Sequence, residues 1–238
     1  MKLTELERTL GHNFKKIDLL ERALTHRSWA HENSSGASER EIALRENESL
    51  EFVGDSVLGL VVAEGLFLKN PSFAEGELTL MKHRLVSTKT LARIGANLKM
   101  GDFLRMGRGE EKTGGREKPA ILADTVEAVI AAIFFDAGYA AARAFIESTF
   151  AGEFQEATPA ASVDYKSLLQ ERLQSRQMAA PEYKVVRTEG APHERTFFVE
   201  AVWEGGRAEG NGTSIKAAEM MAAAQAIETL DGDTKPKL

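Results

Sequence analysis

Residues 47–60 read NESLEFVGDSVLGL, a stretch in which three acids are set into a regular apolar pattern. At about 100° per residue along an α-helix, Glu48, Glu51 and Asp55 fall within about 60° of arc. The leucines and valines of the stretch fall on the opposite side. The sequence therefore predicts a helix that buries one face in a core and presents a stripe of carboxylates on the other.

A second segment, ILADTVEAVIAAIF at 121–134, repeats this arrangement with Asp124 and Glu127 three residues apart. Most acids on helices simply face solvent. However, like charges at this spacing destabilise a helix, and no basic residue separates the acids of the first stripe. Small residues next to the acids would allow two helices to approach closely: Gly54, Ser56, Gly59, Ala123, Thr125 and Ala128. Facing stripes would bring four or more carboxylates together, an arrangement that requires a cation.

The residue types indicate which cation this is. Oxygen ligands without histidine or cysteine point to a hard ion, Mg²⁺, with Mn²⁺ as a substitute. No histidine follows a glutamate at the spacing of di-iron bundles, and no loop carries the alternating Asp/Asn oxygens of an EF-hand. A hard-ion site built on helices is typical of phosphodiester hydrolysis.

Composition restricts the class of protein. The chain has 238 residues and no cysteine, which excludes disulfides and thiolate metal sites. The N-terminus mixes charges at helical spacing, and the most apolar run ends at Glu64, far too short for a membrane span. We expect a soluble cytoplasmic protein with no membrane contact and no small-molecule cofactor. The net charge of −6 means that any polyanion must be bound by local basic patches.

The first part of the chain, residues 1–150, has helical spacing of its apolar residues nearly throughout. The predicted helices lie near 17–24, 40–69, 75–95, 119–136 and 138–150. Residues 151–162 lose this periodicity and are interpreted as a linker. The first part is therefore predicted to be an all-α domain.

The pattern changes in residues 163–232, which predict a small α+β domain of order α-β-β-β-α. The predicted elements are a helix over 164–178, strands near 183–186, 196–203 and 207–210, and a last helix capped by Thr213 or Ser214. A turn at Gly205-Gly206 joins the second and third strands. Residues 233–238 are a tail.

Four segments together carry a family resemblance. NESLEFVGDSVL resembles the signature of the ribonuclease III family of double-stranded-RNA endonucleases. ALTHRS at 23–28, AEGELTLMKHRLVS at 74–87 and ILADTVEAVIAAIF resemble its other blocks, in the same order. The α-β-β-β-α segment looks like the family's C-terminal double-stranded RNA-binding domain. The similarity covers about residues 3–230 and implies the bacterial two-domain form.

The resemblance implies roles for the acids. Glu51, Asp55, Asp124 and Glu127 match the metal-site carboxylates, and Asp55 and Glu127 match the positions treated as catalytic. Glu48 and Glu75 match nearby acids that position metal water or RNA. His26 is expected to be structural or capping. The implied reaction is Mg²⁺-dependent hydrolysis of double-stranded RNA that leaves 5′-phosphate and 3′-hydroxyl ends with a short 3′ overhang.

Phe52 lies at an unusual angle for an apolar residue, beside the acids rather than in the apolar arc. It is either a local packing residue or a contact with another subunit. The resemblance implies the second, because the family is a homodimer and Phe52 matches an aromatic that docks into the partner. The family's usual substrates are ribosomal RNA precursors, with some messenger and small RNAs.

RNA-binding positions also carry over by resemblance. The residues are Ser167, Gln170 and Glu171 on the first helix of the second domain, Pro192 and His193 in a loop, and Lys216 on the last helix. The basic cluster of the last helix is depleted, since Ile215 and Glu219 stand at two of its three basic positions. We therefore expect weak RNA binding by this domain alone. The loop 105–118 carries five basic residues that either face solvent or grip phosphates.

Two alternatives use the same fold. One is a protein that binds double-stranded RNA without cutting it, and the other is a structural ribosome-associated protein. Both should have lost acids from the metal site, and the second should be basic. The chain keeps all six acids, which favours the endonuclease.

Overall fold

The computed structural model describes residues 3–162, 164–191 and 195–232. The chain forms two compact units, residues 1–162 and residues 163–238. Each unit has its own hydrophobic core, so each is described separately.

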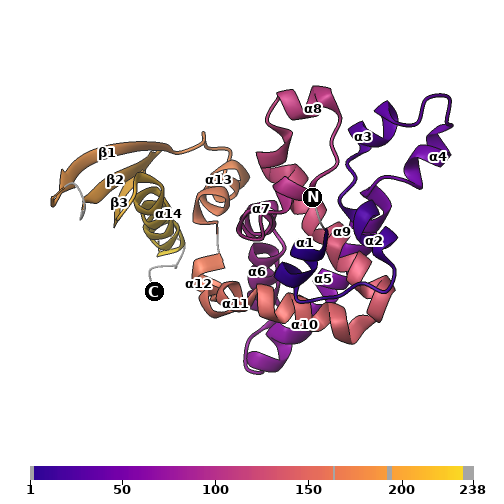
Figure 1. Ribbon diagram of the computed structural model, residues 1–238. Coiled ribbons are helices and arrows are strands. Elements are labelled where there is room, and N and C mark those ends of the chain that lie inside the picture. Colours follow the sequence, from indigo (N-terminus) through magenta and orange to yellow (C-terminus); the bar gives the residue numbers. More distant parts are fainter. Residues whose placement is uncertain (1–2, 163, 192–194, 233–238) are drawn as a thin grey trace. The chain divides into compact units, whose positions relative to one another are not determined.

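The first unit is helical throughout, as Figure 1 shows. Its α-helices are α1 (Leu3–Leu10), α2 (Ile17–Ala23), α3 (Arg27–Glu32), α4 (Glu39–Ala43), α5 (Glu48–Lys69), α6 (Glu75–Leu85), α7 (Thr88–Asn97), α8 (Arg108–Lys112), α9 (Pro119–Ala137), α10 (Tyr139–Thr149), α11 (Ala151–Glu156) and α12 (Pro159–Ser162). Two 3₁₀ turns, η1 (Met100–Phe103) and η2 (Gly115–Glu117), lie between α7 and α9.

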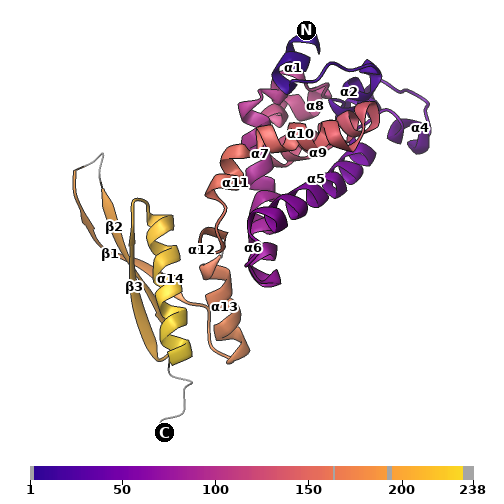
Figure 2. The same cartoon turned by 90° about the horizontal axis from the view of Figure 1, so that it is seen from below.

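Helix α9 is the centre of this unit, and α2, α5, α7 and α10 pack around it (Figure 2). It begins with Pro119, a residue suited to the first helical turn. From Val126 to Ile133 every residue except Glu127 is buried, which is unusual for a surface helix and expected for a central one.

The closest helix approach occurs where α5 crosses α9. A Cβ atom added at Gly54 would lie 1.8 Å from the backbone carbonyl oxygen of Glu127. Only a residue without a side chain fits there, so Gly54 allows the backbones of the two helices to touch. The predicted role of small residues in a close helix approach is thus observed at this position.

Two predicted helices are divided in the structure. The segment 40–69 forms α4 and α5, and 75–95 forms α6 and α7. In the second case the Ser87 side chain accepts a hydrogen bond from the Thr90 backbone, which starts a new helix at Thr88. Local capping therefore ended helices that apolar spacing alone would have continued.

The segment 151–162, interpreted as a linker, contains α11 and α12. Ala157, between them, is buried in the core of the first unit. Apolar periodicity did not predict these helices, because the segment is short and rich in small and polar residues and only a few of its positions face the core.

The second unit has the predicted order α-β-β-β-α. Its elements are α13 (Tyr165–Ser175), β1 (Glu182–Glu189), β2 (Thr196–Trp203), β3 (Gly206–Gly212) and α14 (Ile215–Gly232). The sheet is antiparallel in the order β1-β2-β3, and α14 lies across it (Figures 1 and 2). Val199, Ala201 and Trp203 are buried at alternate positions of β2, and Phe197 on the same face is partly buried. The fold class predicted from the sequence is confirmed.

Turn and cap positions refine the prediction for this unit. Trp203 pairs with Gly206, so the hairpin turn consists of Glu204 and Gly205 rather than two glycines. Gly205 has φ +90°, which explains the glycine at this position. Ser214 is the residue that caps α14, through its hydroxyl and the Ala217 backbone. Within the described residues, no helix is long and apolar enough to cross a membrane.

Gly54→Ala should destabilise the first unit by about 3 kcal/mol, because overpacking at a rigid backbone contact forces α5 and α9 apart. Gly59→Ala on the same helix is the matched control. A Cβ at Gly59 meets only the flexible end of Lys82, at 3.5 Å, so alanine should be neutral or stabilising by up to about 1 kcal/mol. Urea unfolding followed by circular dichroism measures both. Equal changes in the free energy of unfolding for Gly54→Ala and Gly59→Ala would show that the backbones of α5 and α9 are not in close contact at Gly54.

Candidate active site

Three carboxylates converge where α5 crosses α9. Oxygen atoms of Glu51, Asp124 and Glu127 all lie within 4.8 Å of one another, and each side chain is partly buried. Asp124 and Glu127 are three apart on α9, so both point to the same side of that helix. The contact at Gly54 brings this side against α5, where Glu51 projects one turn earlier. The two stripes predicted from the sequence therefore face each other.

The site concentrates negative charge in a partly dry environment. Burial raises the pKa of Glu127 to about 8, with further contributions from the charges of Asp55, Glu51 and Asp124. Burial also raises the pKa of Glu51 to about 7, and Asp124 and Glu48 add to the effect. The pKa of Asp124 is raised too, chiefly by burial and against the influence of His26. Without a counter-ion, the ionised acids destabilise one another.

Asp55 and Glu75 lie outside this close group of described residues. Asp55 is exposed on α5, yet it is the carboxylate that most raises the pKa of Glu127. Glu75 begins α6, where its carboxylate accepts a hydrogen bond from the Thr79 hydroxyl at 2.8 Å. The structure therefore brings three of the six acids together, with Asp55 near them and Glu75 engaged within α6.

A cavity of about 330 Å³ opens beside the acids. Its lining residues are His26, Arg27, Asn47, Glu48, Glu51, Ile121 and Asp124. Glu48 is thus at the same cavity as two of the clustered acids, although its carboxylate is not part of the close group. His26, Arg27 and Asn47 give one wall of the cavity a polar and partly basic character. Such a wall suits an anion bound next to a cation that the acids hold.

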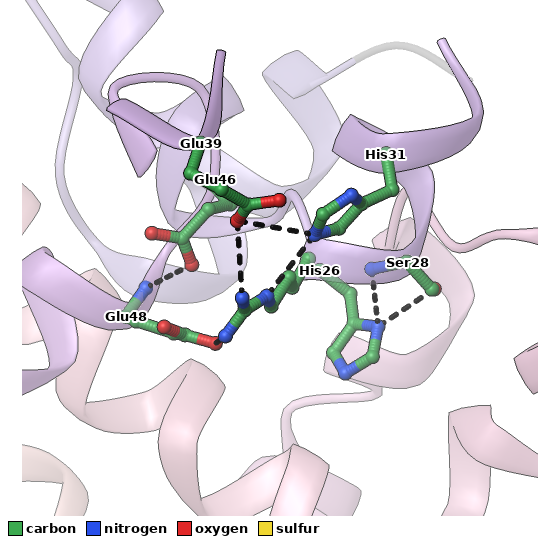
Figure 3. A network of polar contacts seen from close by, with 7 residues as sticks. His26, Ser28, His31, Glu39, Glu46 and Glu48 are labelled. Carbon is green, nitrogen blue, oxygen red and sulfur yellow. Dashed lines mark hydrogen bonds and ion pairs between the residues drawn. The ribbon is translucent and has the colours of Figure 1, made fainter. Parts of the chain in front are cut away.

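Two residues near this cavity were not assigned from the sequence. Glu46 is 2% exposed, and its carboxylate accepts a 2.7 Å hydrogen bond from the Glu48 backbone, which caps the start of α5 (Figure 3). Burial raises the pKa of Glu46. Arg27 contacts Glu48 at 3.3 Å. Glu46 lies two residues before the start of an apolar helix, and this position was the sequence signal for the cap. No such signal connects Arg27 with Glu48, because the two residues are far apart in the sequence.

His26 has the capping role expected for it. Its ring accepts a hydrogen bond from the Ser28 backbone at the start of α3 (Figure 3). Its backbone N–H donates a hydrogen bond to the Arg105 carbonyl. Since His26 also lines the cavity, the cap fixes α3 beside the acids.

Three of the five basic side chains in the loop 105–118 have partners within the protein. Arg116 donates hydrogen bonds to the carbonyls of Gly101 and Leu104, both at 2.8 Å. Lys118 pairs with Glu110, and Arg105 stacks on Trp29 at 3.8 Å from the ring centroid. These contacts fix the three side chains within the loop, and a phosphate-gripping role for the loop stays a prediction.

Comparison with known proteins agrees with this arrangement. A family profile described as "Ribonuclease-III-like" matches residues 16–154, and one described as "Double-stranded RNA binding motif" matches residues 165–230. The chain belongs to the ribonuclease III family. It is an endoribonuclease, as the sequence predicted.

Similar proteins span nearly the whole chain. Ribonuclease 3 of Nitratidesulfovibrio vulgaris is 43% identical over 229 residues, covering 95% of this chain and 88% of that protein. Ribonuclease 3 of Clostridium acetobutylicum is 44% identical over 231 residues, covering 96% and 97%. A solved nuclease domain of the Campylobacter jejuni enzyme matches with a TM-score of 0.57 and 40% identity, covering 65% of this chain and 99% of that one.

The second unit brings together three of the residues predicted to bind RNA. Ser167, Gln170 and Lys216 line a cavity of about 320 Å³. Glu171 is exposed on α13. Beside them, Lys166 pairs with Glu219 at 2.6 Å, so the acid in the depleted basic cluster is neutralised. Pro192 and His193 lie outside the described residues.

Removing one charge from the acid cluster should stabilise the metal-free protein. We expect Glu127→Gln to raise the free energy of unfolding by on the order of 1 kcal/mol at neutral pH in EDTA, because the amide avoids the cost of a buried, crowded carboxylate. The folded-state pKa of Glu127 is raised, so the wild type loses stability as pH rises from about 5 to about 8. The advantage of the variant should grow over this range.

Urea unfolding at several pH values measures this advantage. Glu147→Gln, at an exposed acid on α10, is the control and should stay within about 0.5 kcal/mol of the wild type. A Glu127→Gln protein less stable than the wild type at pH 8 would contradict the crowding of the acids.

Proposed function

We propose that this enzyme hydrolyses double-stranded RNA with Mg²⁺ held by Glu51, Asp55, Asp124 and Glu127, and that Mn²⁺ substitutes. The observation that carries the proposal is the convergence of Glu51, Asp124 and Glu127 within 4.8 Å from two helices. Such an arrangement destabilises the apoprotein, and a divalent cation compensates it.

The donors fit a hard ion. Every side chain in the close group offers a carboxylate oxygen, the ligand that Mg²⁺ prefers, and the group includes no imidazole or thiolate. When bound, the ion supplies a Lewis acid that activates water for attack on phosphorus and stabilises the leaving oxygen. Glu51, Asp124 and Glu127 would hold the ion together with Asp55.

The chain's own residues divide the remaining work. Asp55 and Glu127 are the catalytic pair of this proposal, supported by the charge of Asp55, which together with burial raises the pKa of Glu127. Glu48, at the cavity wall, positions water or RNA, and Glu75 is assigned the same task. The products carry 5′-phosphate and 3′-hydroxyl ends with short 3′ overhangs. Precursors of ribosomal RNA and some messenger and small RNAs, processed in the cytoplasm, are the proposed substrates.

The second unit supplies duplex recognition in this proposal. The RNA-binding-motif match and the cavity lined by Ser167, Gln170 and Lys216 support contacts with 2′-hydroxyls and phosphates. Of the two lysines that line this cavity, Lys166 is paired with Glu219, in keeping with weak binding by this unit alone.

Duplex cleavage on both strands requires two sites, and we propose a homodimer that provides them. Phe52 is 76% exposed in the isolated chain, and Leu60 and Phe67 are exposed further along α5. Exposed apolar side chains grouped on one helix are typical of a subunit interface. The similar Campylobacter jejuni nuclease domain is described as structurally flexible in a region involved in its dimer formation.

The decisive experiment incubates the full chain with long duplex RNA, with and without Mg²⁺. Wild-type protein should cleave only with the ion, while Glu127→Gln should bind the duplex within about threefold and cleave at least about 100-fold more slowly. Glu147→Gln should cleave like the wild type. A wild-type chain that binds the duplex but leaves it intact in Mg²⁺ would instead be a non-cleaving RNA-binding protein.

Phe52→Ala should raise the dimer dissociation constant at least about 30-fold, because a buried aromatic at an interface contributes about 2 kcal/mol or more. Analytical ultracentrifugation measures the constant. Ile215→Ala removes an exposed apolar side chain from the second unit, 45% exposed, and should leave dimerisation unchanged. A Phe52→Ala protein that dimerises normally would assign Phe52 to local packing.

A further inference from the structure

Glu48 is held apart from the clustered acids. It begins α5 one turn before Glu51 and lines the same cavity as Glu51 and Asp124. Its Oε1 atom lies 3.3 Å from Nη1 of Arg27. Among the described residues, the close group of carboxylates contains Glu51, Asp124 and Glu127 but not Glu48.

The Arg27 guanidinium is fixed from several directions. Its Nη2 atom lies 3.3 Å from Oε2 of Glu39 on α4, and its Nε–H donates to Nε2 of His31 at 3.2 Å. Glu39, Glu48 and His31 converge from three helices (Figure 3). Each of the three guanidinium nitrogens therefore contacts a partner, which restricts the orientation of the side chain.

The backbone that carries Arg27 is also anchored. His26 caps α3 and donates its backbone N–H to the Arg105 carbonyl, and the Gly107 backbone donates to the Ser28 hydroxyl at 2.9 Å. Arg27 therefore projects from a fixed helix start at the rim of the cavity. These backbone contacts do not involve Glu48.

Stability alone gives a weak reason for this pair. The Arg27 and Glu48 side chains are 50% and 53% exposed, and ion pairs this exposed to solvent contribute little to stability. The charge of Glu48 is the main cause that raises the pKa of Arg27, so the two groups do interact. The main effect of the pair is on the Glu48 carboxylate, which contacts Arg27 and lies outside the close group of Glu51, Asp124 and Glu127.

We infer that Arg27 is a positioning residue that holds Glu48 at the cavity wall, outside the acid cluster. The cation would then be bound by Glu51, Asp55, Asp124 and Glu127 without Glu48, and positions next to it would stay open for water and the RNA phosphate. Freed from Arg27, Glu48 would lie close enough on α5 to compete for those positions. This inference rests on the proposed Mg²⁺ site.

Metal binding without RNA tests the inference directly. Mn²⁺ titration of the full chain by calorimetry should show about fivefold tighter binding to Arg27→Ala, because the substitution frees a carboxylate and removes a positive charge. Arg27→Lys retains the charge and one contact, so it should stay within about twofold of the wild type. A role of Arg27 in folding alone would weaken metal binding instead.

Two further variants separate the role of Glu48 from other effects. Glu39→Gln breaks the contact with α4 but leaves the Arg27–Glu48 pair, and should change Mn²⁺ binding by less than about twofold. In a Glu48→Gln background, adding Arg27→Ala should tighten binding by no more than about twofold, the effect of charge alone. These variants form a double-mutant cycle. Arg27 and Glu48 are coupled if Arg27→Ala changes Mn²⁺ affinity by different factors in the wild type and in the Glu48→Gln background.

Cleavage should move in the opposite direction to metal affinity. At saturating Mg²⁺, single-turnover cleavage by Arg27→Ala should be about tenfold slower, with Arg27→Lys partly restored. Unchanged or weaker Mn²⁺ binding to Arg27→Ala, or equal tightening in the Glu48→Gln background, would overturn the inference. If Glu127→Gln left Mn²⁺ binding unchanged, or if the wild type bound no Mn²⁺, the proposed function itself would be overturned.

Discussion

The contact between the backbones of α5 and α9 at Gly54 is the constraint on which the site depends. Helices usually lie about 8–10 Å apart because side chains separate them. Here one helix has no side chain at the crossing, and the Glu127 carbonyl occupies the space. Acids on the two facing surfaces are therefore brought within reach of one ion. A larger separation would leave two unrelated acidic stripes on a helical bundle.

This arrangement works against the stability of the apoprotein. Burial and mutual repulsion raise the pKa of each clustered acid, and the buried core of α9 offsets the cost. Two nearby acids have partners outside the cluster: the Glu46 carboxylate accepts a hydrogen bond at the start of α5, and Glu48 pairs with Arg27. Their charges therefore add less to the repulsion within the cluster. The fold thus tolerates a strained group of three acids by keeping others out of it.

Much of the fold and the candidate site followed from the sequence, because apolar and acidic residues repeat at helical spacing and strand residues alternate. Periodicity placed Glu51 and Glu127 on facing stripes, and resemblance supplied the metal roles, which stay predictions. The capping that divided 40–69 and 75–95 was missed, because a cap depends on one side chain rather than on a repeat. The contacts of Arg116 could not be read from the sequence, because the carbonyls it binds become neighbours only after folding.

The separate cores have a consequence for the history of such genes. The buried apolar clusters of the first unit end by residue 157, and the cluster of the second begins at residue 169. A recombination event between residues 162 and 163 would leave every one of these clusters whole. Fusion, duplication or replacement of either half could therefore occur without redesigning the other, and cutting and duplex-binding modules could be inherited independently.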